Sequence, residues 1–135
     1  MTMSVAIIDD DESIRRSFAR LLRLAGLSPS AFRSAEEFLA SPLREGFGCL
    51  IVDVQLRAGC MSGLDFLRRM FDCGDDTPVI FLTAHDDAET QAEAMRMGSI
   101  GFFRKGANPM SLVELVLRVE RGECVPATDA RRRRR

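Results

Sequence analysis

Three short apolar segments, each followed at once by polar residues, constrain the fold of this chain more than any other feature. They cover residues 5–8, 49–52 and 79–82. Each is continuous rather than alternating, which is typical of strands that are buried on both faces. We therefore expect three central parallel strands, with two weaker strands near 30–32 and 100–103 completing a sheet of five.

Helical periodicity fills the intervals between these segments. Residues 14–25 carry an apolar stripe at helical spacing, and Gly26 follows as a stop signal. Further helices are expected over 35–41, 64–72, 88–97 and 109–121. Ser34 and Glu37 have capping-box spacing, and Asn108 with Pro109 is a typical helix start. The strand–helix alternation predicts an α/β fold, a doubly wound five-stranded parallel sheet with five helices.

The length and charge of the chain indicate one folded domain followed by a charged tail. At 135 residues there is room for a single domain, which we place at 1–123. The net charge of −1 includes five arginines at 131–135, so the first 130 residues carry −6. An acidic domain argues against direct binding of nucleic acid. We expect 124–135 to be a solvated, disordered Arg-rich tail.

Cysteine usage and hydropathy bear on location. The four cysteines show neither a CxxC pair nor metal-ligand spacing, and no secretory segment precedes the first strand. No apolar run approaches the roughly 18 residues of a membrane span. The expectation is a reduced, cytoplasmic protein that is not inserted in a membrane.

Chemically useful side chains follow four of the expected strands. In an open α/β sheet, ligands bind at the carboxyl ends of the strands. The residues at those positions are Asp9, Asp10 and Asp11 after the first strand, Asp53 after the third, Thr83 after the fourth and Lys105 after the fifth.

Carboxylates gathered at one edge raise each other's pKa unless a cation joins them, and hard oxygen ligands favour Mg²⁺ together with a phosphate oxygen. Lys105 is the only lysine among 19 basic residues, and a compact ammonium suits a phosphoryl oxygen in a narrow site. Cation, ammonium and hydroxyl would stabilise a phosphoryl group in transfer. Asp53, alone at the end of the central strand, is the candidate nucleophile.

In these residues the chain resembles the receiver domains of two-component response regulators, over 4 to about 122. The acidic pair, the Asp after strand three, the Thr-Ala pair of Thr83 and Ala84 and the Lys after strand five occur in the family's order. The stretch 61–67 is similar to receivers that precede LuxR-type DNA-binding domains. The resemblance implies a flavodoxin-like (βα)5 fold.

Carried over by position, the resemblance makes Asp53 the phosphoacceptor and assigns Mg²⁺ to Asp9, Asp10 and Asp53, with Asp10 favoured as a direct ligand. The backbone carbonyl of Gln55 would complete the metal site, and its side chain would tune access of water. Thr83 would bond the phosphoryl group and Lys105 would pair with it.

The resemblance also implies a phosphorelay. Phe102 stands at the aromatic switch position, coupled to Thr83, and Ala84 and His85 are possible modulators. The output surface would be the fourth helix, fifth strand and fifth helix, near 87–121, which could also form a homodimer. The expected partners are a sensor histidine kinase and a downstream effector or fused output domain. Such a switch is not a conventional enzyme, although it catalyses its own phosphorylation and dephosphorylation.

Two departures from the family pattern concern loops beside the acceptor. The segment from Asp53 to Gly63 is about two residues longer than usual and lacks its proline. Gly106 follows Lys105 where the family has proline, often with a cis peptide, which costs about 3 kcal/mol or more without proline. Lys105 is therefore expected to be held less rigidly.

Other interpretations stay open. Asp9 and Asp10 could simply cap the first helix, Lys105 could be a surface cation, Phe102 a core residue and His85 an exposed loop residue. A degenerate receiver could bind a partner without phosphorylation. A Mg²⁺ phosphohydrolase of the haloacid-dehalogenase type would use Asp9 as nucleophile, but no acidic pair follows the lysine.

Overall fold

The computed structural model describes residues 2–56, 61–85 and 87–123, and within them the predicted alternation of strands and helices is present. The strands are β1 (Ser4–Ile8), β2 (Ser28–Phe32), β3 (Cys49–Asp53), β4 (Val79–Thr83) and β5 (Gly101–Arg104). The helices are α1 (Glu12–Leu24), α2 (Ala35–Ala40), α3 (Gly63–Asp72), α4 (Ala88–Arg96) and α5 (Pro109–Glu120), with a 3₁₀ turn, η1 (Arg44–Gly46), before β3. Expected and observed bounds agree to within two residues.

All five strands are parallel, in the order β2-β1-β3-β4-β5. Their carboxyl ends therefore lie along one edge of the sheet. The chain leaves β1 toward β2 and then returns to the other side of β1 with β3, so the strand order reverses between β1 and β3. A doubly wound sheet binds ligands at such a reversal, and Asp53 is the last residue of β3.

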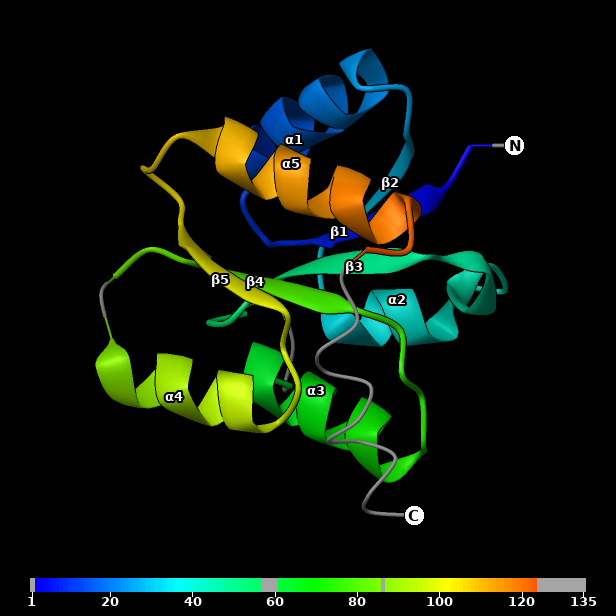
Figure 1. The fold of residues 1–135 in the computed structure, drawn as a ribbon. Helices are drawn as coiled ribbons and strands as arrows, with labels where there is room; N and C mark the ends of the chain where they lie inside the picture. Colours follow the sequence, from blue (N-terminus) through cyan, green and yellow to red (C-terminus); the bar gives the residue numbers. More distant parts are fainter. Residues whose placement is uncertain (1, 57–60, 86, 124–135) are drawn as a thin grey trace.

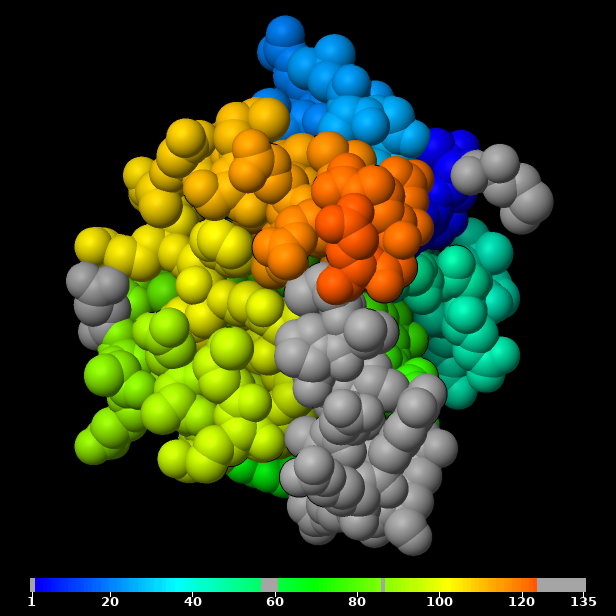
Figure 2. All heavy atoms as spheres, in the orientation of Figure 1, coloured from blue at the N-terminus to red at the C-terminus, as the bar shows by residue number. Residues whose placement is uncertain are grey.

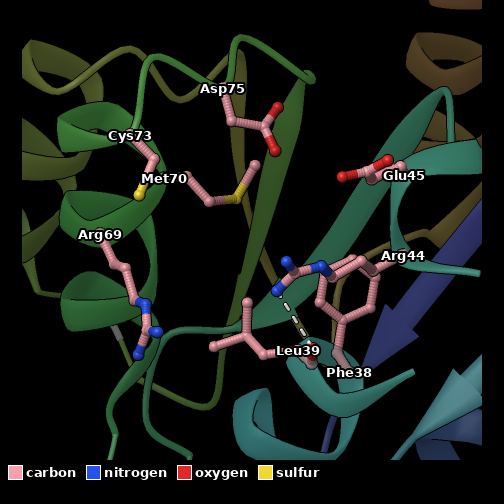
Figure 3. Close-up of a pocket in the computed structure, with 8 residues that line it drawn as sticks. All are labelled: Phe38, Leu39, Arg44, Glu45, Arg69, Met70, Cys73 and Asp75. Carbon is pink, nitrogen blue, oxygen red and sulfur yellow. Dashed lines mark hydrogen bonds between the residues drawn. The ribbon is translucent and has the colours of Figure 1, made fainter. Parts of the chain in front are cut away.

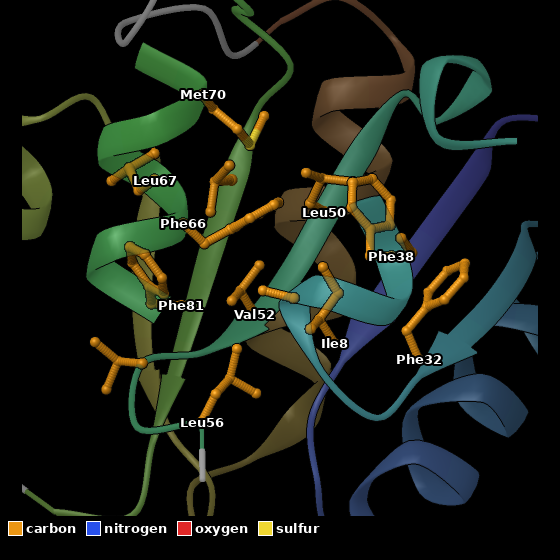
Figure 4. Packing of buried hydrophobic residues seen from close by; sticks show 14 of the residues in the cluster. Ile8, Phe32, Phe38, Leu50, Val52, Leu56, Phe66, Leu67, Met70 and Phe81 are labelled. Carbon is orange, nitrogen blue, oxygen red and sulfur yellow. The ribbon is translucent and has the colours of Figure 1, made fainter. Parts of the chain in front are cut away.

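The helices cover both faces of the sheet, with α1 and α5 on one face and α2, α3 and α4 on the other (Figure 1). Alternate residues of each central strand point to opposite faces, which divides the core into two apolar clusters. In the cluster beneath α2 and α3, Phe38 packs edge-on against Phe32 and Phe66 with centroid distances of 5.3 and 5.6 Å (Figure 4). Continuous apolar strands are thus explained by burial on both faces.

Helix starts are set by polar caps, as the sequence indicated. The side chain of Asp11 accepts from Ser13 N at 2.9 Å at the start of α1, and Asn108 does the same for α5 ahead of Pro109. Ser62 forms a capping box at the start of α3. The Cβ that any other residue would have at the next position, Gly63, would lie 2.4 Å from the carbonyl oxygen of Asp53, so α3 starts directly against the end of β3.

A hollow of about 310 Å³ lies away from the carboxyl edge of the sheet, between α2–η1 and the C-terminal half of α3. Figure 3 shows Phe38, Leu39 and Met70 among the side chains that line it, and Arg44 donating to the Leu39 carbonyl at 3.1 Å. This contact caps the end of α2. The hollow does not touch the residues at the strand ends.

The remaining expectations concern the cysteines, the tail and membranes. Of the cysteines that the structure describes, Cys49 is buried and Cys73 exposed, and neither forms a disulfide, whereas Cys60, the loop 57–60 and the tail 124–135 lie outside the described residues. Across the described ranges, no helix combines the length and apolar character that a membrane crossing requires.

Candidate functional site

The carboxylates of Asp9, Asp10 and Asp53 converge at the carboxyl edge of the sheet. One oxygen from each lies within 4.8 Å of the others. Asp9 directly follows β1 and Asp53 ends β3, and these two strands are hydrogen-bonded neighbours. The parallel register therefore brings together carboxylates that are more than forty positions apart in the sequence, as predicted.

Lys105, which directly follows the edge strand β5, extends its side chain to this cluster. Its Nζ lies 3.0 Å from Oδ2 of Asp53 and 3.0 Å from Oδ2 of Asp9, and it donates to Oδ1 of Asp9 at 3.3 Å. The Lys105 amide donates to the Thr83 carbonyl at 2.8 Å and so extends the pairing of β4 with β5. No cis peptide occurs within the described ranges, which include the Lys105–Gly106 bond. The lysine is placed by the sheet and is not a freely solvated surface cation.

Burial shapes the electrostatics of the cluster. Burial is the main cause that raises the pKa of Asp9; the hydrogen bonds from the Asp11 amide and Lys105 oppose it, and the charge of Asp53 adds to it. For Lys105, burial acts to lower the pKa, but the hydrogen bonds to Asp9 and Asp53 outweigh it and leave the pKa raised. The lysine therefore stays charged at neutral pH.

The donor set fits a divalent cation. Asp9, Asp10 and Asp53 offer three carboxylate oxygens that converge on one point. Oδ2 of Asp9 is completely buried and has no hydrogen-bond partner within the described residues, although the charge of Lys105 is close. Hard carboxylate oxygens of this kind are the ligands that Mg²⁺ prefers.

A small cavity of about 190 Å³ opens onto the cluster. It is lined by Asp10, Asp11, Asp53, Gln55, Ala84 and Lys105. The amide of Gln55 donates to Oδ1 of Asp53 at 2.9 Å and fixes the orientation of that carboxylate. Asp9, in contrast, is 0% exposed. An incoming group in the cavity would meet Asp53, which disfavours the alternative with Asp9 as nucleophile.

Thr83 and Phe102 lie beside this cavity rather than in it. The Thr83 hydroxyl donates to the His85 carbonyl at 2.9 Å and accepts from the His85 amide at 3.2 Å. A neighbouring cavity of about 340 Å³ is lined by Thr83, Asp87, Ala88, Gln91, Phe102 and Arg104. Phe102 is half-buried, with its ring 6.3 Å from that of Phe81, and His85 is exposed. Thr83 and Phe102 therefore line one shared cavity.

Two contacts were not foreseen from the sequence. The amide of Asp11 donates to Oδ1 of Asp9 at 2.8 Å, and Arg15 donates to the Asp9 carbonyl at 2.8 Å. Asp11 caps α1 and also orients a site carboxylate. The signal for Arg15 is its position one turn into α1, because helical side chains lean back toward the helix start.

Comparison with known proteins agrees with the fold and the order of these residues. The sequence model of the response regulator receiver domain matches residues 5–117. Response regulator protein TodT of Pseudomonas putida is 38% identical over 101 residues, which cover 75% of this chain and 44% of TodT. Transcriptional regulatory protein FixJ of Rhizobium meliloti is 35% identical over 115 residues, which cover 85% of this chain and 55% of FixJ.

Solved structures give the same result. The crystal structure of FixJ-N superposes with a TM-score of 0.76 at 32% identity and covers 90% of this chain and 95% of its own. A receiver protein from Pseudoalteromonas atlantica has a TM-score of 0.81 at 24% identity, covering 88% of this chain and 98% of its own, and supports the fold alone. The chain therefore belongs to the response regulator receiver domains, the switch modules of two-component systems. It spans about half the length of the curated relatives that it matches.

Proposed function

We propose that this receiver is a phosphorelay switch that accepts a phosphoryl group on Asp53 from a histidine kinase in a Mg²⁺-dependent reaction. The observation that carries the proposal is the position of Lys105, whose Nζ lies 3.0 Å from Oδ2 of Asp53 and 3.0 Å from Oδ2 of Asp9. The lysine thus lies where an oxygen of a phosphoryl group on Asp53 would need a counter-charge.

In the transfer, a carboxylate oxygen of Asp53 attacks the phosphorus of a phosphohistidine. The O–P bond forms while the N–P bond breaks, and the imidazole nitrogen keeps the electron pair and takes a proton from solvent. The Gln55 amide holds one Asp53 oxygen, so the other is presented in a fixed direction. The ammonium of Lys105 balances charge on the phosphoryl oxygens.

Asp9, Asp10 and Asp53 would hold Mg²⁺, together with the backbone carbonyl of Gln55. The complete burial of Asp9 and the convergence of the three carboxylate oxygens within 4.8 Å of one another support this assignment. When bound, Mg²⁺ would neutralise negative charge on the transferring group.

The signal would leave through Thr83 and Phe102. A phosphoryl group on Asp53 would compete with the His85 backbone for the Thr83 hydroxyl, and movement of Thr83 would change the cavity that it shares with Phe102. Figure 2 looks onto α4, β5 and α5, where these elements adjoin in one surface. We propose that this surface forms a homodimer or contacts an effector or a fused output domain. FixJ and TodT extend well beyond the matched region.

Intact-mass spectrometry after incubation with acetyl phosphate tests the proposal. We expect one added phosphoryl group with Mg²⁺ present, and none after chelation or in Asp53→Asn. BeF₃, which activates the DrrB receiver domain in a solved structure, can serve as a mimic of the phosphoryl group for following the switch. Phosphate on Asp9 would favour the phosphohydrolase alternative. No gain under any condition would leave the phosphorylation-independent interaction module as the better account.

A further inference from the structure

The guanidinium of Arg15 makes a contact that the phosphoryl chemistry does not require. Its Nη1 donates to the main-chain carbonyl of Asp9 at 2.8 Å in a partly buried position. Arg15 lies in the first turns of α1, and its amide bonds the Asp11 carbonyl at 3.0 Å. Its side chain therefore leans back over the helix start and ties α1 to the end of β1.

With this contact, Asp9 is held through its amide, its carbonyl and its carboxylate. Its amide donates to the Phe32 carbonyl at 3.0 Å, and its Oδ1 accepts from the Asp11 amide at 2.8 Å. Asp9 is also completely buried. The buried Oδ2 that faces Lys105 is thus directed by contacts on the rest of the residue.

Arg15 supplies a hydrogen-bond donor to the Asp9 carbonyl at a point where β2 has ended and offers no further main-chain donor. The Asp9 amide pairs with Phe32, which is the last residue of β2. Beyond Phe32 the chain turns away into α2, whose N-cap is Ser34. The guanidinium takes the place of the next main-chain donor, and a hydrogen bond from a charged donor is roughly twice as strong as a neutral one.

We propose that Arg15 is a positioning residue of the cation site, a role that rests on the function proposed above. Its hydrogen bond fixes the main chain of Asp9, so the Asp9 carboxylate stays aligned with Asp10 and Asp53. In this role Arg15 acts through the Asp9 carbonyl and not on the substrate or the cation itself.

Removing Arg15 should change the affinity for the cation in two opposing ways, and a control variant at Arg16 distinguishes between them. Loss of a positive charge near the carboxylates favours cation binding, whereas loss of the carbonyl contact weakens it. Arg16 is the adjacent arginine, with a side chain 80% exposed and paired with Glu12 at 3.4 Å. Arg16→Met removes a charge from the same turn and leaves the Asp9 contact intact.

The first experiment is a calorimetric titration of the full chain with MgCl₂ at fixed ionic strength. The chain has no Trp or Tyr, so intrinsic fluorescence is a poor reporter. We expect Arg15→Met to weaken Mg²⁺ binding about tenfold, equivalent to roughly 1.4 kcal/mol. Arg16→Met should bind Mg²⁺ at least as tightly as the wild type, and Arg15→Lys, which keeps a charged donor, should recover part of the loss. An affinity for Mg²⁺ in Arg15→Met equal to that in Arg16→Met would overturn the proposal.

The second experiment needs no cation. Solvent-exchange NMR of the Asp11 amide reports directly on its bond to the Asp9 carboxylate. In metal-free protein we expect exchange to be about tenfold faster in Arg15→Met and unchanged in Arg16→Met. If the wild type binds no Mg²⁺, the proposed function fails on its own, while the Asp11 exchange rate still decides whether Arg15 positions Asp9. An unchanged rate in Arg15→Met would refute the positioning role.

Discussion

Replacing Lys105 with methionine measures how much the lysine charge stabilises the carboxylate site when no metal ion is bound. The lysine side chain is 18% exposed, and its partners Asp9 and Asp53 have side chains that are 0% and 5% exposed. Removing one partner of a buried ion pair costs about 3 to 5 kcal/mol, because the remaining charge is left uncompensated. Since Lys105 keeps some contact with solvent, we expect a loss near the lower end, about 3 kcal/mol.

The assay is urea unfolding followed by far-UV circular dichroism in the presence of EDTA. Arg68→Met is the control, because Arg68 is 50% exposed and forms surface ion pairs with Asp65 at 3.2 Å and Glu93 at 3.0 Å. Exposed pairs contribute about 0 to 1 kcal/mol, so this variant should stay close to the wild type.

A double-mutant cycle then tests the cause. In an Asp9→Asn background one buried charge is already gone, so Lys105→Met should cost clearly less than in the wild type. An equal loss in the two backgrounds, or a loss no larger than that of Arg68→Met, would falsify the ion-pair reasoning and assign the effect to packing of the lysine stem.

Two further predictions concern the scaffold around the site. Gly63→Ala would place a Cβ 2.4 Å from the Asp53 carbonyl oxygen, so we expect a loss of about 1 to 3 kcal/mol and slower phosphorylation of Asp53. Gly46→Ala is the control, since its Cβ would meet nothing within 4 Å, and equal stability of the two variants would contradict the clash. Phe66→Ala empties a 0% exposed core position and should cost about 3 to 5 kcal/mol in urea unfolding. Leu24→Ala, at a 77% exposed position, should cost little, and a comparable loss there would contradict the assignment of the core.

The fold could be predicted because its signals are local. Continuous apolar strands, helix caps such as Asp11 and Asn108 and stop glycines such as Gly26 each act within a few residues, and the parallel alternation leaves few topologies. Once the strands are parallel, Asp53 and Lys105 must meet at the carboxyl edge. The weaker boundary predictions, near 30–32 and 100–103, concern the two edge strands, whose sequences carry fewer buried residues.

The individual hydrogen bonds of the site depend on the distances between separate segments of the fold, and these distances cannot be predicted from local sequence patterns. Arg15 looks like an ordinary surface residue of α1, and only the distance between α1 and the end of β1 gives it a carbonyl to bind. In the same way, spacing indicated that Thr83 lies at the edge but not that its hydroxyl bonds the His85 backbone. Both contacts depend on how a helix or loop leaves its strand.

The charge balance of the site leads to a last prediction, on pH. Burial raises the pKa of Asp9 in the folded state above the value of 3.8 for a free side chain. The folded state then binds more protons than the unfolded state between these two pKa values. Without a cation, the contribution of Asp9 to stability is therefore fully present below 3.8 and is lost as pH rises through the raised pKa.

A bound cation should reverse this trend, because it favours the ionised carboxylate that burial disfavours. Below the raised pKa, Mg²⁺ and a proton compete for the Asp9 carboxylate, so the affinity for Mg²⁺ should fall as pH falls through that pKa, and its stabilising effect should grow as pH rises. Urea unfolding at a series of pH values, with and without MgCl₂, measures both trends, and Asp9→Asn should flatten them. A stabilisation by Mg²⁺ that does not vary with pH would show that the Asp9 carboxylate is not part of the cation site, and the carboxylate ligands would then be Asp10 and Asp53.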